Sequence, residues 1–277
     1  MGRAARGATR VTMAERIDLG TPFLRLLIED HLAWCTIERP AARNALTSAM
    51  YFGLKRAVAC VERCERPTAL ILTGTGDVFA PGGELRGKQD DHNPALDGLS
   101  AMDVVPFEAI RASRAPVVSA VNGIAMGGGL LIAMLSDVAV ASERAIFRAP
   151  ELLLGIADTG YAAYLPAHVG IARAREMLLT GRRIGAHEAL AMGLVARVVP
   201  HEKLLDEARS AAEDMLRCGP EARMHVKRII NAGYGAVDRM TFEASVTGAE
   251  AREGMRSFAE KRSPAWVPDA LRRAPQA

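Results

Sequence analysis

Short apolar runs recur through the first 150 residues of the chain and predict buried β-strands. The runs cover residues 23–28, 32–37, 69–73, 115–121, 137–142 and 145–149. Because only Glu29, Asp30 and His31 separate the first two runs, these predict a β-hairpin. After Thr47 the apolar residues change to helical spacing, so we expect a helix that Thr47 caps and that ends near Glu65.

The most apolar stretch, residues 122–137, reads NGIAMGGGLLIAMLSD and directly follows the run 115–121. Its three consecutive glycines precede a segment too apolar for a surface helix, which predicts a strand, a glycine turn and a buried helix. The first N–H groups of a helix have no partner within it, and the helix dipole places about half a positive charge there. We therefore expect this turn to bind negative charge that forms on a substrate.

The remaining pattern predicts loops and helices around these strands. A second glycine-rich turn lies at residues 74–87, polar residues 88–100 predict a mobile loop, and residues 101–113 predict a helix. Beyond residue 172 the pattern is almost wholly helical. These patterns divide the chain into a disordered tail (1–20), an α/β core (21–200) and a helical extension (201–277).

The charges of the chain balance outside its first residues. The formal net charge is +3, but Arg3, Arg6 and Arg10 lie in an opening segment without acids; the other 32 basic residues face 32 acidic ones. A near-neutral body argues against nucleic acid as a partner. No apolar run approaches the roughly 20 residues of a membrane span, and the opening lacks the core of a secretory signal, so we expect a cytoplasmic protein without membrane contact. Met13 is a plausible alternative start.

Common cofactor and metal motifs are missing from the sequence. The cysteines, Cys35, Cys60, Cys64 and Cys218, contain no CxxC pair, so we expect reduced thiols. Four residues beyond His187 and His201 stand Ala191 and Leu205 rather than a second histidine. The sequence also lacks a G-x-G-x-x-G fingerprint after a strand, a phosphate-binding P-loop and a G-x-S-x-G elbow. We therefore expect no metal and no separate cofactor.

Six motifs follow one another between about residues 26 and 266. They read ERPAARNALTSAM, GTGDVFAPGGEL, APVVSAVNGIAMGGGLLIAMLSD, APELLLGI, LTGRRIGAHEALAMGLVARVVP and EAREGMRSFAEKRSPAW. In this order they resemble the crotonase family, the enoyl-CoA hydratases and isomerases. The resemblance implies an α/β crotonase spiral of ββα units, with C-terminal helices that build a homotrimer or a dimer of trimers. It also implies an acyl-CoA thioester as substrate, with coenzyme A as part of that substrate.

The resemblance assigns an oxyanion hole to Gly83 and Gly128, whose backbone N–H groups would stabilise a thioester enolate. Family hydratases use two glutamates to hold water and move protons. The second corresponds to Glu151, whereas the first corresponds to Leu131, which cannot accept a proton. One glutamate suffices for the family's isomerases, so double-bond isomerisation is the preferred prediction and hydration of a trans-2-enoyl-CoA the alternative.

The segment GIADTGYAAYLP, residues 155–166, departs from the family pattern. Many relatives have a proline and a glycine run here, whereas this chain is one residue shorter and carries Asp158. Some relatives place an aspartate nearby as a second acid or base, which makes Asp158 a catalytic candidate. Asp is equally a common N-cap residue, so Asp158 could instead cap a helix that begins at Thr159.

The resemblance also predicts the residues that contact the substrate. Backbone around two loops would border the pantetheine and adenine, two residues of an adjacent subunit would reach the nucleotide, and two tyrosines would narrow the acyl pocket. The two loops are formed by Ala41, Ala42 and Arg43 and by Gly83, Glu84, Leu85 and Arg86. The residues of the adjacent subunit are Phe258 and Lys261, and the tyrosines are Tyr161 and Tyr164. For Phe258 and Lys261, subunit packing and a solvated charge are the respective alternatives.

Loss of turnover is a rival interpretation. Leu131 and Pro81 both depart from the family pattern, and this would suit a protein that binds acyl-CoA without converting it. The retained Glu151 favours an enzyme.

Overall fold

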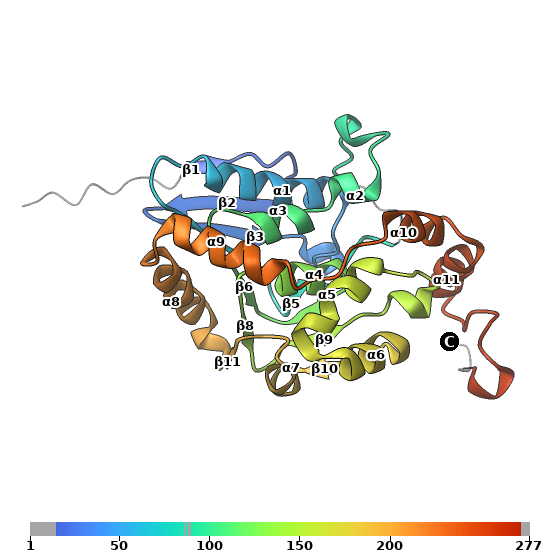
Figure 1. The fold of residues 1–277 in the computed structure, drawn as a ribbon. Coiled ribbons are helices and arrows are strands. Elements are labelled where there is room, and N and C mark those ends of the chain that lie inside the picture. Colours follow the sequence, from blue (N-terminus) through green and yellow to red (C-terminus); the bar gives the residue numbers. More distant parts are fainter. Residues whose placement is uncertain (1–14, 86, 88–89, 273–277) are drawn as a thin grey trace, which may run out of the picture.

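Two β-sheets form the centre of the protein (Figure 1). The computed structural model describes residues 15–85, 87 and 90–272. A seven-stranded sheet has the order β1-β2-β3-β4-β6-β8-β11, and a four-stranded sheet has the order β10-β9-β7-β5. The strands are β1 Glu15–Ile17, β2 Leu24–Glu29, β3 Leu32–Ile37, β4 Ala69–Gly74, β5 Val78–Ala80, β6 Val117–Val121, β7 Ile124–Met126, β8 Val138–Ser142, β9 Ile146–Arg148, β10 Ile184–Gly185 and β11 Arg197–Val199.

Three successive turns of the chain each add one strand to each sheet. The pairs β4 and β5, β6 and β7, and β8 and β9 each place their first strand in the large sheet and their second in the small one. Successive units are parallel in both sheets, and helical segments follow each pair. This repetition confirms the predicted crotonase spiral of ββα units. The antiparallel hairpin of β2 and β3 is also confirmed.

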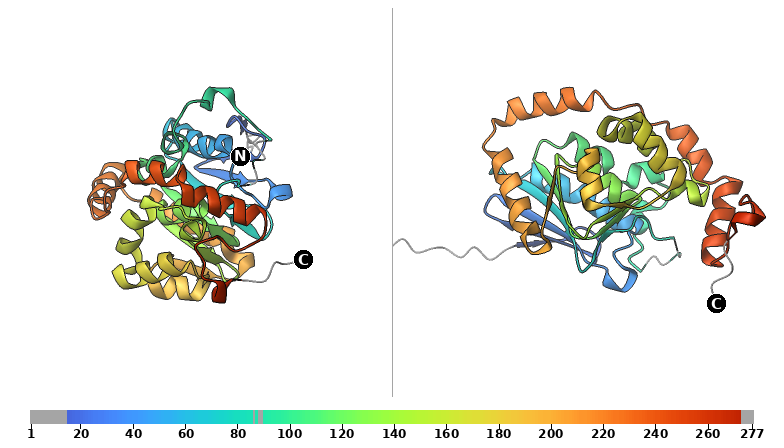
Figure 2. Two further views of the ribbon diagram at one scale, coloured as in Figure 1. Left: turned by 90° about the vertical axis from the view of Figure 1, so that its right-hand side faces the viewer. Right: turned by 90° about the horizontal axis from the view of Figure 1, so that it is seen from below.

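Helices enclose the sheets (Figures 1 and 2). The α-helices are α1 Ser48–Glu62, α2 Ala101–Val104, α3 Phe107–Ala112, α4 Gly128–Leu135, α5 Thr159–Val169, α6 Ile171–Thr180, α7 Ala186–Met192, α8 Leu204–Leu216, α9 Pro220–Asn231, α10 Arg239–Val246 and α11 Ala249–Ala259. The short 3₁₀ helices among the described residues are η1 Pro40–Ala42, η2 Pro94–Leu96, η3 Glu151–Leu154, η4 His201–Lys203 and η5 Asp269–Leu271. Thr47 caps α1, as predicted, by accepting a hydrogen bond from Met50 N.

Strand alternation divides the apolar residues of the large sheet between two faces. Ile71 and Val118 pack on one face with Ala208 of α8, whereas Leu70 and Val117 belong to the main core on the other. Helix α4 lies in that main core with every residue after Gly128 buried, as its apolar sequence predicts. The first part of the helical extension therefore completes the core, while α11 packs against η3 at one end of the molecule.

Three local predictions need correction. The two glycine-rich segments contain the short strands β5 and β7 rather than turns alone. The helix predicted for residues 101–113 is two helices, because Pro106 has no N–H to continue α2. Residues 15–17 of the expected tail form β1 on the edge of the large sheet; residues 1–14 lie outside the described chain.

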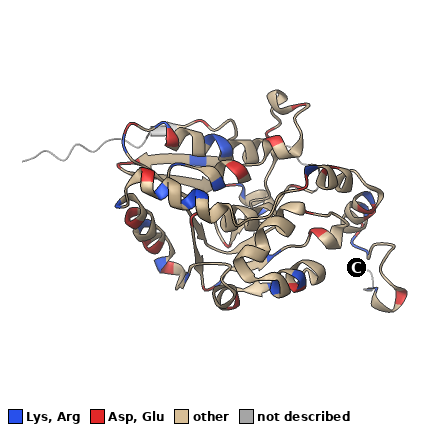
Figure 3. Cartoon of the chain, viewed as in Figure 1, with Lys and Arg blue, Asp and Glu red and all other residues tan. Residues whose placement is uncertain are grey.

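Basic and acidic residues are interspersed over the outer helices (Figure 3). Helix α9 additionally exposes Val226, Ile229 and Ile230, each at least half accessible to solvent. No helix in the described part of the chain is long and apolar enough to cross a membrane.

Candidate active site

The two glycine-rich segments lie against each other. Gly82 and Gly127 both have positive φ, at 99° and 51°, which favours glycine. A Cβ atom placed on Gly82 would lie only 3.3 Å from the Cα atom of Gly127. The close approach brings the residues that follow them, Gly83 and Gly128, to one site from separate ββα units.

The amide groups of Gly83 and Gly128 are available as donors. Gly83 forms an isolated parallel bridge with Leu46, in which the neighbouring residues make the hydrogen bonds. Gly128 is the first residue of α4, and helix geometry leaves its N–H without an intrahelical acceptor. Within the described residues neither N–H has a hydrogen-bond acceptor. Two such donors beside a helix N-terminus suit an anionic oxygen.

Tyr161 holds the backbone of the second glycine turn. Its side chain is fully buried, and its hydroxyl donates a 2.5 Å hydrogen bond to the carbonyl oxygen of Gly127. Tyr161 lines a smaller cavity of about 450 Å³ between η3, α5 and α6. Glu151 lines this same smaller cavity, whereas Tyr164 lines the larger cavity described below.

Glu151 begins η3, directly after the third ββ pair. A Cβ atom on Gly127 would lie 2.9 Å from its Oε1, so the carboxyl group adjoins the glycine turns. Its Oε2 is buried and has no hydrogen-bond partner. Burial, and then the negative charge of Asp158, raise the pKa of Glu151 to about 8. A buried carboxyl with such a pKa can both accept and donate a proton near neutral pH.

Asp158 is the N-cap of α5. Its Oδ1 accepts hydrogen bonds from Gly160 N at 2.9 Å and Tyr161 N at 3.2 Å. No described residue donates a hydrogen bond to Oδ2, and Asp158 lines both cavities. Burial raises its pKa, while the two amide bonds act in the opposite direction. The predicted cap is thus present, and one oxygen is still available to the site.

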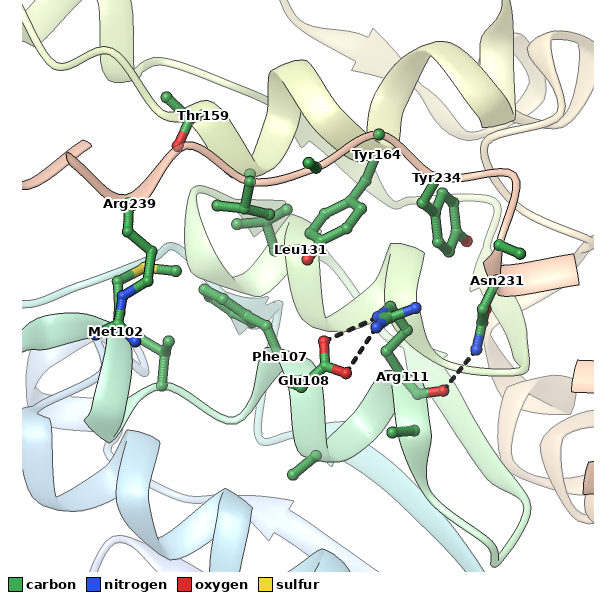
Figure 4. A pocket seen from close by; sticks show the side chains of 18 of the residues that line it. Met102, Phe107, Glu108, Arg111, Leu131, Thr159, Tyr164, Asn231, Tyr234 and Arg239 are labelled. Carbon is green, nitrogen blue, oxygen red and sulfur yellow. Dashed lines mark hydrogen bonds and ion pairs between the residues drawn. The ribbon is translucent and has the colours of Figure 1, made fainter. Parts of the chain in front are cut away.

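The larger cavity, of about 1030 Å³, is lined by Asp158 and by residues of α3, α4 and α5 (Figure 4). Phe107, Leu131 and Tyr164 point into it, and a bidentate Arg111–Glu108 ion pair lies farther along. Leu131 is buried one turn into α4, where the resemblance expects an acid. Leu131 lies three residues beyond Gly128, so this cavity extends from the end of α4 that carries one amide donor, and its apolar lining suits an acyl chain.

The remaining predicted contact residues lie outside both cavities. Ala41 and Ala42 belong to η1, Arg43 follows it in left-handed conformation, and Leu85 is partly exposed. Phe258 and Lys261 are exposed at the end of α11. Arg86 lies outside the described residues.

A buried ion pair connects the two predicted coenzyme A loops. Arg39 donates hydrogen bonds to Glu84 Oε2 at 3.0 Å and to Asp90 Oδ2 at 2.8 Å. Asn44 adds hydrogen bonds to the carbonyl oxygens of Thr75 and Val78. The side chain of Glu84 therefore holds the loops together. Arg39 and Asn44 were not predicted as functional residues, although both lie in the motif ERPAARNALTSAM.

Tyr51 of α1 was also not predicted. Its ring packs edge-on against Phe107, with ring centroids 6.1 Å apart, and its hydroxyl lies beside Gly128. Only the spatial contact between α1 and α4 reveals its position, since nothing in the helical pattern distinguishes Tyr51 from a packing residue.

Comparison with known proteins identifies the family. The sequence model of the enoyl-CoA hydratase/isomerase family matches residues 28–269. This chain is an enoyl-CoA hydratase/isomerase family member. The family's crotonyl-CoA hydratase from Syntrophomonas wolfei is 36% identical over 86% of this chain and 95% of its own length. The probable mitochondrial enoyl-CoA hydratase of Dictyostelium discoideum is 32% identical over 83% of this chain and 86% of its own.

Solved structures of the family include both reaction types. An enoyl-CoA hydratase/isomerase from Pseudoalteromonas atlantica T6c superposes with a TM-score of 0.77 at 30% identity, covering 88% of this chain and all of its own. A monofunctional enoyl-CoA isomerase from M. smegmatis superposes with a TM-score of 0.66 at 30% identity, covering 80% of this chain and 99% of its own. Relatives named for hydration and relatives named for isomerisation thus have similar sequence identity to this chain, and family membership alone does not identify the reaction.

Proposed function

We propose that the protein is an enoyl-CoA isomerase in which Glu151 alone moves the proton. The observation that supports this most directly is the position of Glu151 Oε1 against Gly127, beside the two amide donors. A thioester carbonyl bound to Gly83 and Gly128 would place its neighbouring carbon within reach of this carboxylate. Leu131 supplies an apolar wall on the side where a second acid would hold water.

The reaction needs only one proton carrier. Ionised Glu151 removes a proton from C2 of a 3-enoyl-CoA, and the electron pair of that C–H bond delocalises into the thioester carbonyl. The amides of Gly83 and Gly128 stabilise the resulting enolate oxygen. Glu151 then returns the proton to C4, and the electrons of the C3–C4 double bond form the new C4–H bond. The C1–C2 electrons of the enolate move to form the C2–C3 double bond as the carbonyl is restored, and a 2-enoyl-CoA results. Water is neither added nor lost.

A hydratase is the second candidate, because Asp158 has an oxygen without a partner facing the cavities. A water molecule between Glu151 and Asp158 would have two acceptors, as hydration requires. The amide bonds to Oδ1 fix the position of Asp158, which favours Glu151 as the group that moves the proton.

The surrounding chain suggests how the rest of the substrate binds. The larger cavity would take the acyl group, and the linked loops at residues 41–43 and 83–86 would border coenzyme A. The exposed apolar residues of α9 suit burial between subunits, which supports a homotrimer or a dimer of trimers. Phe258 and Lys261 could then complete a neighbouring nucleotide site.

Product analysis tests the proposal. Purified protein is incubated separately with cis-3-enoyl-CoA, trans-2-enoyl-CoA and 3,5-dienoyl-CoA, and the products are identified by mass spectrometry. We expect cis-3-enoyl-CoA to become trans-2-enoyl-CoA, with loss of this conversion in Glu151→Gln. Rapid water addition to the trans-2 substrate would favour the hydratase. Tight acyl-CoA binding without any turnover would indicate a binding protein.

A further inference from the structure

Tyr51 lies where the two glycine turns meet. A Cβ atom on Gly128 would overlap the Tyr51 hydroxyl oxygen, and one on Gly83 would lie 3.8 Å from it. The hydroxyl is therefore next to both residues whose amides form the candidate oxyanion site. No other side chain approaches both hypothetical Cβ positions among the described residues within 4 Å.

The hydroxyl of Tyr51 is fixed and available. The ring packs edge-on against Phe107, which itself lines the larger cavity. Burial, followed by the negative charges of Glu151 and then Asp158, raises the pKa of Tyr51, so the group keeps its proton at neutral pH. No hydrogen bond joins this hydroxyl to any described residue. A neutral tyrosine in that state carries one O–H donor for a ligand.

We propose that Tyr51 is a catalytic residue that donates a third hydrogen bond to the thioester oxygen, together with Gly83 N and Gly128 N. This role rests on the proposed function. A neutral carbonyl oxygen accepts the third hydrogen bond weakly beside the two amide bonds, whereas an enolate oxygen carries more charge and accepts it strongly. The extra bond therefore strengthens as the enolate forms, which lowers the barrier more than it improves substrate binding.

Tyr51→Phe tests the role because it keeps the ring and removes the donor. We expect kcat for isomerisation to fall about 10- to 100-fold with KM changed less than about threefold, somewhat below the usual loss for a backbone oxyanion donor. Ser119→Ala is the control: it removes a buried hydroxyl of β6 that contacts Ser136 and neither glycine turn. We expect this control to retain wild-type kcat.

A spectroscopic measurement separates this proposal from the choice of reaction. A saturated acyl-CoA labelled with ¹³C at the thioester carbonyl is bound to each protein, and its carbonyl stretching frequency is recorded. Hydrogen bonding lowers that frequency, so we expect a smaller lowering in Tyr51→Phe than in the wild type or Ser119→Ala. The measurement needs no turnover, and it stays informative if no enoyl-CoA is isomerised.

Equal carbonyl frequencies in the wild type and Tyr51→Phe would overturn the role of Tyr51. Unchanged kcat in the variant would do the same. If Tyr51→Phe does not fold, 3-fluorotyrosine at position 51 replaces it, because its more acidic hydroxyl is a stronger donor. We then expect a further lowering of the frequency, and no change would contradict the proposal.

Discussion

Glu151 and Asp158 are two buried carboxylates seven residues apart, and their hydrogen bonds differ. Asp158 gives one oxygen to the amides at the start of α5, whereas Glu151 has a buried oxygen without any partner. Burial is the largest influence on both and raises both pKa values. Two amide hydrogen bonds to Oδ1 oppose the effect of burial at Asp158, whereas Oε2 of Glu151 has no hydrogen bond that would do so.

The difference suggests a division of labour between the two acids. Two helix amides fix the position of Asp158 and favour its negative charge, although burial acts more strongly in the opposite direction. That charge in turn raises the pKa of Glu151, so the unpartnered acid is the one suited to exchange protons. One residue would then carry the proton while the other sets its acidity.

Removing the proton carrier gives the largest expected effect. We expect Glu151→Gln to lower kcat by about 10³-fold, within the usual range for loss of a general acid–base group. Initial rates with cis-3-enoyl-CoA measure this, while acyl-CoA binding by calorimetry shows that the site is intact. Comparable rates in the variant and the wild type would remove Glu151 from the mechanism.

The same substitution should stabilise the fold near neutral pH. The folded-state pKa of Glu151, about 8, exceeds its ordinary value of 4.5, so folding favours the protonated form and wild-type stability falls as pH rises between these values. Glutamine does not titrate. From pH 4 to pH 7 we expect the free energy of unfolding of Glu151→Gln to gain about 3 kcal/mol relative to the wild type. Urea unfolding at both pH values measures this gain, and a constant difference would mean that Glu151 is ionised in the fold.

Neutralising the fixed charge tests the influence of Asp158 on Glu151. Asn caps helices as well as Asp, so Asp158→Asn keeps α5 while removing the charge. In the wild type we expect kcat/KM to rise with pH around a midpoint near 8, because Glu151 must be ionised to act as a base. In Asp158→Asn the midpoint should move to lower pH, yet stay above 4.5 because burial persists. Loss of activity at every pH would instead indicate that Asp158 exchanges protons itself.

The cap gives the smallest expected effect. Asp158→Ala removes the two amide bonds as well as the charge, and we expect it to be about 1 kcal/mol less stable than Asp158→Asn, the typical contribution of an N-cap. Thermal and urea unfolding of the matched pair measure the difference. Equal stability would show that the cap does not hold α5.

Much of the fold could be predicted from hydrophobic periodicity. The hairpin, α1 with its Thr47 cap and the buried α4 follow from runs long enough to show a period. Strands β5 and β7 have three residues each within glycine-rich segments, so they show no distinguishable period. They form because neighbouring units of the spiral supply the pairing partners.

The site was less accessible from sequence. The roles of Gly83, Gly128 and Glu151 came from resemblance, and their adjacency depends on the packing of separate ββα units. The hydrogen bond of Tyr161 to Gly127, and the cavity that Tyr161 shares with Glu151, depend on how α5 packs against the glycine turns, which local sequence does not encode. Tyr51 depends on the contact of α1 with α4, which local sequence does not encode.

The hydrogen bond from Tyr161 to Gly127 affects a peptide group at both of its ends. Amide resonance joins the carbonyl of Gly127 to the N–H of Gly128, so a donor at the oxygen draws electrons away from the nitrogen. An anion at Gly128 would meet a more positive N–H than an unassisted amide offers. The tyrosine would thus tune the strength of a backbone donor through conjugation, without itself contacting the ligand.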